Sequence, residues 1–302
     1  MSTSPIKILR RYTAQIKSML RGGGDAQEQE GLLSLLAEYN SKNLLIAEQK
    51  YDADGELEEL HSYTYDANGH LTEHVMELPQ DGINERFITT RNGDGLPMSI
   101  VKFYGDDPGE KVEYTYGTHS HPVEIVRYDA DGEFESKELL SYDDQSRLVE
   151  RKIESPSEGN KRFAFTYSEK GLITREEEFD AAGSLVSKLE YEYDMQDREV
   201  SLAKWNKDGK VVSVLRSEYN ELGRLVRRVS KGFYTRITLY EYDELGRLLE
   251  EALSDENGFV ISRNRMEYDE HGNVLEETVY ETDLTRAGRD THLAHRFEYE
   301  FF

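Results

Sequence analysis

The chain has 302 residues, with 37% hydrophobic and 32% charged residues, so it is poorer in apolar residues and richer in charge than an ordinary globular domain. Its 61 acidic and 37 basic residues give a net charge of -24, which argues against nucleic acid as the main partner, because phosphate backbones require a basic surface. The absence of cysteine excludes a disulfide framework and thiolate chemistry.

Residues 1–21 differ from the rest of the chain in charge. They contain no acidic residue and five basic ones: Lys7, Arg10, Arg11, Lys17 and Arg21. The apolar residues between Ile6 and Leu20 fall on the other side of a helical wheel. We therefore expect a basic amphipathic helix over residues 1–21, ended by the glycines at 22–24.

This basic segment has three interpretations. The helix folds back and caps the acidic remainder, or it docks a separate partner or an anionic membrane surface; an Arg-rich, acid-free start also resembles a transit peptide. Residues 22–42 are expected to form a linker and a second short helix, from Gly31 to Tyr39, which covers the first strand.

Residues 43–302 are built from repeats of a short motif, which is intact at Tyr242-Asp-Glu-Leu-Gly-Arg-Leu248. Asp favours the first position of a type I turn and Gly the fourth, where φ is positive, so the motif predicts a hairpin with a three-residue loop and a glycine bulge. Tyr242 then faces Leu248, and Asp243 faces Arg247. The turn residues that we assign on this basis are Tyr65, Asp66, Gly69, Tyr219, Gly223, Tyr242, Asp243, Gly246, Tyr268, Asp269 and Gly272.

The spacing of the motif predicts the architecture. Its tyrosine position recurs every 25 or 26 residues with one interval of 23, and a second series of turns lies between these positions. Each period thus holds two strands and two turns at opposite edges. We expect an all-β repeat fold, a long antiparallel meander of about 18 to 20 strands that curls into a shell or superhelix, because open sheets rarely exceed about 10 strands.

A second aromatic residue often lies two positions before the motif tyrosine, as at Tyr63, Phe165, Tyr191 and Tyr240. Residues i and i+2 share one face of a strand, so these rings predict an aromatic ladder along the sheet. The ladder is either packing or a ligand platform.

The sequence Tyr-Asp-x-x-Gly-Arg-Leu, at 242–248 and nearly intact at 219–225, resembles that of the YD-repeat, or Rhs-like, family of bacterial proteins. The resemblance covers roughly residues 48–280. It implies a curled β-sheet shell of the kind found around polymorphic toxins and in toxin complexes, and carbohydrate binding has been attributed to such repeats.

Searching for catalytic or metal-binding patterns gives little. His119 and His121, and His292 with His295 near Asp290, are weak candidates for metal ligands, and the turn aspartates do not match a calcium loop. No phosphate loop, nucleophile elbow or HExxH pattern occurs. We therefore expect no cofactor, no metal and no enzymatic activity.

The sequence favours a noncatalytic protein-binding scaffold of bacterial origin, which the family resemblance extends to an immunity, chaperone or accessory protein of a toxin or secretion system. A cationic protein partner suits the acidic surface, and the basic residues of segment 1–21 are the candidate docking residues. The alternative is a carbohydrate-binding module that uses exposed tyrosines and Trp205. No signal peptide or apolar span is evident, so we expect a cytoplasmic protein, with peripheral membrane contact through residues 1–21 as a further option.

Overall fold

The structure is a computed structural model that describes residues 5–15, 31–118, 120–282 and 290–302, which form one sheet of 22 strands. The first eleven are β1 (Ile6–Gln15), β2 (Leu32–Tyr39), β3 (Leu45–Tyr51), β4 (Leu57–Tyr65), β5 (Leu71–Leu78), β6 (Ile83–Arg91), β7 (Pro97–Tyr104), β8 (Asp107–Tyr116), β9 (Pro122–Tyr128), β10 (Phe134–Tyr142) and β11 (Leu148–Glu154). The others are β12 (Lys161–Tyr167), β13 (Ile173–Phe179), β14 (Leu185–Tyr193), β15 (Glu199–Asn206), β16 (Val211–Tyr219), β17 (Leu225–Lys231), β18 (Thr235–Tyr242), β19 (Leu248–Asp255), β20 (Val260–Tyr268), β21 (Val274–Glu281) and β22 (Thr291–Phe301).

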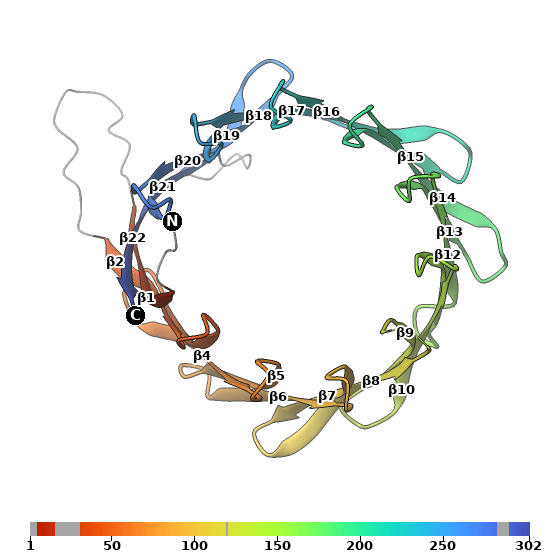
Figure 1. Cartoon of the computed structure of the whole chain (residues 1–302), viewed down its shortest axis with the longest axis horizontal. Helices are drawn as coiled ribbons and strands as arrows, with labels where there is room; N and C mark the ends of the chain where they lie inside the picture. Colours follow the sequence, from red (N-terminus) through yellow and green to blue (C-terminus); the bar gives the residue numbers. More distant parts are fainter. Residues whose placement is uncertain (1–4, 16–30, 119, 283–289) are drawn as a thin grey trace.

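Every strand pairs antiparallel with the next one in the sequence, and the sheet closes because β1 pairs with both β2 and β22. In this seam Arg10 lies opposite Leu36 on one side and Glu298 on the other. The result is a ring around a wide opening, with β1 and β22 side by side at the point of closure (Figure 1). The predicted meander is confirmed, and it closes completely.

The two predicted N-terminal helices are wrong. The described part of segment 1–21 is the strand β1, and the predicted helix from Gly31 to Tyr39 is the strand β2. Eight of the ten residues of β1 are half-buried, so no alternation of exposed and buried positions marks it as a strand. No helix occurs among the described residues, and none of them could therefore cross a membrane as an apolar helix.

The hairpin at Tyr242–Leu248 has the predicted geometry. Tyr242 lies opposite Leu248, the amide of Gly246 donates to the carbonyl of Asp243, and Gly246 has a φ of 90°. The carboxylate of Asp243 accepts hydrogen bonds from the amide and from the guanidinium Nε of Arg247. The local sequence therefore determines both the turn and the strand pairing that follows it.

The motif tyrosine also joins neighbouring hairpins. The hydroxyl of Tyr268 donates to the carbonyl of Leu248, in the preceding hairpin, at 2.8 Å. Eight other tyrosines make the same bond one repeat along, at 2.7–2.9 Å: Tyr65, Tyr116, Tyr142, Tyr167, Tyr193, Tyr219, Tyr242 and Tyr299. Leu248 thus lies opposite its own Tyr242, and its backbone carbonyl accepts the hydrogen bond of the next tyrosine.

The turns form two unlike rims. The tyrosine rim consists of the turns that follow the motif tyrosines, around residues 41, 67, 93, 119, 144, 169, 195, 221, 244 and 270, and the opposite rim consists of the others. A methyl group added to Gly69, Gly171 or Gly223 of the tyrosine rim would contact the preceding hairpin, whereas Gly55, Gly132, Gly183 and Gly209 of the opposite rim face open space. In Figure 1 the turns of one rim lie inside the band of strands and those of the other project outward.

The ring has almost no enclosed core. Ala37 and Val229 are the buried hydrophobic residues among those described, and the chain exposes 19821 Å². A compact monomer of this mass exposes about 13,000 Å². The protein thus presents about half as much surface again, because one layer of sheet leaves both faces open.

We predict that Tyr219→Phe lowers the free energy of unfolding by about 1 kcal/mol, because it removes only the hydroxyl that bonds the carbonyl of Glu199. Urea unfolding followed by circular dichroism measures the loss. Tyr128→Phe is the matched control, since no hydrogen bond from the Tyr128 hydroxyl occurs in the described structure. Equal stability of the two variants would contradict the role given to the hydroxyl.

Ring closure predicts an intramolecular disulfide in the double variant Arg10→Cys/Glu298→Cys, because these residues lie directly opposite each other. The chain has no cysteine of its own, so faster migration on a nonreducing gel reports this bond alone. Arg10→Cys/Glu276→Cys should stay reduced, because Glu276 lies one strand farther away, at about 10 Å. An open sheet would leave both pairs reduced.

Candidate functional site

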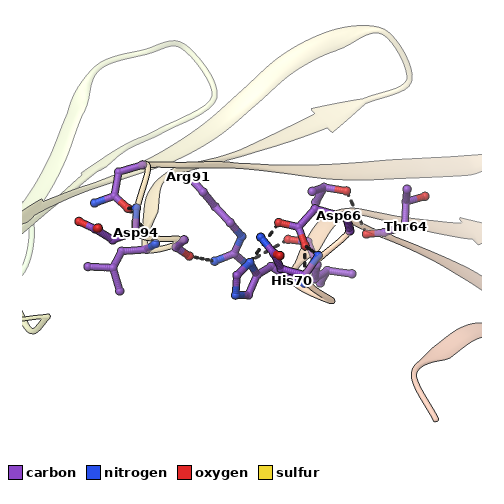
Figure 2. Close-up of polar contacts among 12 residues, drawn as sticks. Thr64, Asp66, His70, Arg91 and Asp94 are labelled. Carbon is purple, nitrogen blue, oxygen red and sulfur yellow. Dashed lines mark hydrogen bonds and ion pairs between the residues drawn. The ribbon is translucent and has the colours of Figure 1, made fainter. Parts of the chain in front are cut away.

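The tyrosine rim holds all eleven turn residues that the motif analysis selected, and their roles there are structural. Arg91 stands where the repeat would place a tyrosine (Figure 2). Its guanidinium donates to the carbonyl of Gly95 in its own turn and to that of Leu71 in the preceding hairpin, at 2.9 and 3.1 Å. Arginine therefore replaces the tyrosine link without breaking the rim.

Arginines of the motif add a second link along this rim. Arg247 binds Asp243 of its own turn, donates to the carbonyl of Asp269 in the next turn, and lies 4.7 Å from the ring centre of Tyr268. Equivalent cation–π contacts join Arg147 to Tyr167 and Arg198 to Tyr219. These arginines therefore link neighbouring turns along the tyrosine rim. Because each of them already has partners within the protein, none is free to bind a ligand.

The basic residues of the N-terminal segment lie partly in the seam. Arg10 forms an ion pair with Glu300 at 2.6 Å, and Nε of Arg11 donates to the hydroxyl of Ser34. Lys7 is also on β1, while Lys17 and Arg21 lie outside the described residues. Arg10 and Arg11 thus take part in closing the ring, and docking of a partner by the five basic residues stays a prediction.

A row of three rings and one lysine crosses four neighbouring strands on the face of the sheet that carries Tyr63, which we call the tyrosine face. Tyr63, His74, Phe87 and Lys102 lie directly opposite one another on β4 to β7. The ring of His74 is parallel to that of Tyr63, with centres 4.6 Å apart, and lies 5.5 Å from that of Phe87. This aromatic row is half-buried, so part of each ring stays exposed.

A chain of hydrogen bonds runs beside the row. Glu59 is 3.0 Å from Nε2 of His61, and Nδ1 of His61 is 3.0 Å from Nε2 of His74. The imidazole planes differ by 15° and their centres are 5.2 Å apart, which suits an edge-to-edge hydrogen bond. When His61 is neutral and donates to Glu59, its bare Nδ1 accepts from His74, so one proton lies between the two rings.

The surroundings disfavour a second charge on this pair. Burial lowers the pKa of His74, and the charge of His61 lowers it further, whereas Glu48 acts in the other direction. The pKa of Glu59 is held low by its hydrogen bonds to His61 and Lys50. The cluster therefore places the Glu59 carboxylate, whose pKa is lowered, beside a pair of rings in which the pKa of His74 is lowered.

The tyrosine face also pairs aromatic rings with carboxylates elsewhere. The hydroxyl of Tyr191 donates to Glu176 at 2.6 Å, and burial with this bond raises the pKa of Tyr191. Tyr240 lies opposite Glu251, whose charge helps to raise the pKa of Tyr240 after burial. The predicted ladder is thus interleaved with residues of the intervening strands, and the face is both aromatic and acidic.

A cavity of about 730 Å³ lies at the seam, between β1, β2, β22 and the turn after β3. Nδ1 of His295 lies 2.8 Å from the hydroxyl of Thr13, which donates to Ser34 at 2.7 Å. Ser34 in turn donates to the carbonyl of Arg11. Burial lowers the pKa of His295, and the Arg11 charge adds to this effect. The polar side chains of Thr13, Ser34 and His295 therefore bond to one another across the strands that close the ring.

The other candidate residues are scattered. His119 lies outside the described residues, His121 stacks on Tyr142, and His292 packs edge-on against Tyr280. No group of three or more potential metal ligands converges in the part of the chain that the structure describes. Trp205 lies on the other face of the sheet with Nζ of Lys188 4.7 Å from its ring centre, so one side of the indole is already covered. Its role in glycan stacking stays a prediction.

Sequence reasoning missed the cluster of Glu59, His61 and His74. His61 and His74 are 13 residues apart, and only the strand register brings them together. The signal was available in principle, because the turn after Tyr65 fixes which residues of β4 and β5 are opposite each other.

No protein-family model and no curated protein matches the sequence. Among solved structures, a TcdB2-TccC3 chain without its hypervariable C-terminal region is 15% identical with a TM-score of 0.45, over 86% of this chain and 16% of that one. The TcdB2-TccC3-Cdc42 structure is 12% identical with a TM-score of 0.32, over 86% and 19%. A porin-like protein from Bacteroides uniformis is 11% identical with a TM-score of 0.33, over 99% of both chains. At these values none of them assigns a family or function, and this chain spans about a sixth of the TcdB2-TccC3 chain.

We predict that stability falls on mild acidification and that His74 carries part of the loss. A histidine whose pKa is lowered by folding stabilises the protein fully above about pH 6.5, and this stabilisation is lost as the pH falls toward the folded pKa. The urea midpoint should therefore decrease between about pH 7.5 and about pH 5.5, and less steeply in His74→Gln. His271→Gln, at an exposed turn position, should retain the full dependence. An unchanged slope in His74→Gln would refute this assignment.

Proposed function

We propose that this protein is a noncatalytic scaffold that holds a cationic polypeptide against the tyrosine face of its ring. The observation that carries the proposal is the single-layer closed sheet, which exposes about half as much surface again as a compact monomer of its mass. A sheet face of this size normally packs against a second layer. Here the described residues supply no such layer, so the face is available to another molecule.

The chemistry of the tyrosine face favours this class of partner. The aromatic row shows that this face already binds cations: Lys102 lies 5.7 Å from the ring centre of Phe87, and Lys50 contacts both Glu48 and Glu59. Tyr63 and Glu176 add a further ring and a further carboxylate to the face. Lysine and arginine side chains bind to such surfaces through ion pairs and cation–π contacts. The net charge of -24 would also steer a cationic chain toward the ring.

The YD-type motif supports a narrower biological role. On this resemblance we extend the proposal to an immunity, chaperone or accessory protein that acts beside a toxin or a secretion system in the cytoplasm of a bacterium. This extension rests on the motif at Tyr242–Leu248 and its copies, and on the hydrogen bonds by which the motif tyrosines link successive hairpins.

The test is site-specific photo-crosslinking in the cells that produce the protein. A benzophenone amino acid in place of Tyr63 should crosslink to a polypeptide, because the ring of this residue lies in the aromatic row. The same group at Thr64 is the matched control, since adjacent residues of a strand point to opposite faces. A polypeptide adduct at position 63 and not at 64 is expected. Equal yields at the two positions, or no adduct at position 63, would refute the proposal.

A further inference from the structure

One stretch of the ring has a charge opposite to that of the rest of the molecule. Residues 204–236 contain nine Lys and Arg against three Asp and Glu, a balance of +6, whereas the rest of the chain carries -30. Within the described residues, Lys207, Lys210 and Lys231 form no ion pair. Free cations are unexpected in so acidic a protein, because nearby carboxylates are abundant partners.

The same stretch ends in exposed aromatic residues. The hairpin between β17 and β18 turns through Gly232, Phe233 and Tyr234, with the side chain of Phe233 93% exposed and that of Tyr234 64% exposed. Their rings meet edge to face at 4.8 Å, and the Arg236 guanidinium lies 5.0 Å from the Tyr234 ring centre. The aromatic pair is therefore held in place before any partner binds.

The formation of a tight turn does not require aromatic residues at positions 233 and 234. Other turns of this rim use Asp or Asn to accept backbone hydrogen bonds and a glycine with positive φ, as at Asp129 and Gly132. The hairpin between β17 and β18 has neither, and it places two large rings where Gly, Asn or Asp would suffice. A departure from the local rule without a gain in packing indicates a functional site.

The lysines and the rings form one surface. The position of a Cβ on Gly232 lies 3.4 Å from the carbonyl oxygen of Val212, so the tip of this hairpin touches the start of β16. Val212 is itself exposed, and Lys210 is two residues before it. We call this surface the basic arc: Lys207, Lys210, Val212, Lys231, Phe233 and Tyr234. The hairpin projects from the ring between β17 and β18 in Figure 1.

We propose that the basic arc docks an acidic polypeptide segment that carries an apolar anchor. The anchor covers Phe233 and Tyr234, and acidic side chains pair with the three lysines. An anionic membrane fits less well, because acidic turns such as 52–56 and 129–133 lie on the same rim and would be repelled by a flat anionic surface. This inference rests on the proposed scaffold function and adds a second site, of opposite charge to the tyrosine face.

The test uses the full chain and immobilised peptides of one length, in which net charge runs from strongly negative to strongly positive, with and without one aromatic anchor. Binding should increase with negative charge, require the anchor and weaken at high salt. Phe233→Ser and the triple variant Lys207→Glu/Lys210→Glu/Lys231→Glu should each weaken it roughly tenfold or more. Met195→Ser, at a 90% exposed residue of the tyrosine rim, is the matched control and should bind like the parent.

Three outcomes would overturn the docking proposal. They are the absence of binding to acidic anchored peptides, equal binding by Phe233→Ser and the parent, and preferential binding to phosphatidylserine vesicles that depends on Phe233. The unfolding midpoint of each variant confirms that the ring is intact, since all five replaced positions are exposed. Failure here leaves crosslinking at position 63 unaffected, so the two proposals fail separately.

Discussion

The hydrogen bond from a motif tyrosine to the carbonyl of the preceding hairpin is the interaction on which this ring depends. Each such bond is neutral and short, and nine of them follow one another along one rim among the described residues. Backbone ladders join neighbouring strands everywhere in a sheet. The tyrosines add their bonds between successive hairpins at one rim, whereas the opposite rim has only scattered links of this kind, such as Gln80 to Leu57 and Ser155 to Glu135, so the tyrosine rim is drawn together more tightly. A sheet with one tightened edge curves, and a curved sheet of sufficient length meets its own beginning.

The same architecture explains how the protein can be stable with so few buried hydrophobic side chains. The described residues include only two buried hydrophobic side chains, yet most side chains are half-buried because neighbouring strands shield them. Stability is therefore distributed over many small terms: strand ladders, cross-strand pairs and capped turns, each worth of the order of 1 kcal/mol or less. Closure of the ring adds to this stability, because no strand of the described sheet is left with an unpaired edge.

The sequence predicted the parts that local chemistry determines. The turn at Asp243–Gly246, its opposed Tyr242 and Leu248, and the alternation of turns between two edges follow from residues within one hairpin. Strands β3 to β22 account for twenty strands, within the predicted number. The failure lies at β1 and β2, whose apolar residues fit a helical period. The second partner of β1, the strand β22, is nearly the whole chain away in sequence. Contacts of such separation leave no local pattern to recognise.

The functional surfaces were predictable to a smaller degree. The acidic, aromatic character of the tyrosine face follows from composition and motif, whereas the bond between His61 and His74 requires the register of β4 and β5. The basic arc depends on Lys210 and Lys231 being brought together by adjacent hairpins, and on the exposure of Phe233. The net charge of the whole chain conceals it, because the -30 carried by the other residues outweighs the +6 of residues 204–236.

Antiparallel pairing of β1 with β22 imposes a parity rule on the family of rings that such repeats can build. Successive strands alternate in direction, so the first and last can pair antiparallel only when the number of strands is even. Rings of this kind can therefore grow or shrink by whole hairpins, each adding about 10 Å of circumference, and never by a single strand. Duplication of one hairpin would yield a wider ring with the same pairing of first and last strands. The diameter of the opening could therefore change during evolution in steps of one hairpin.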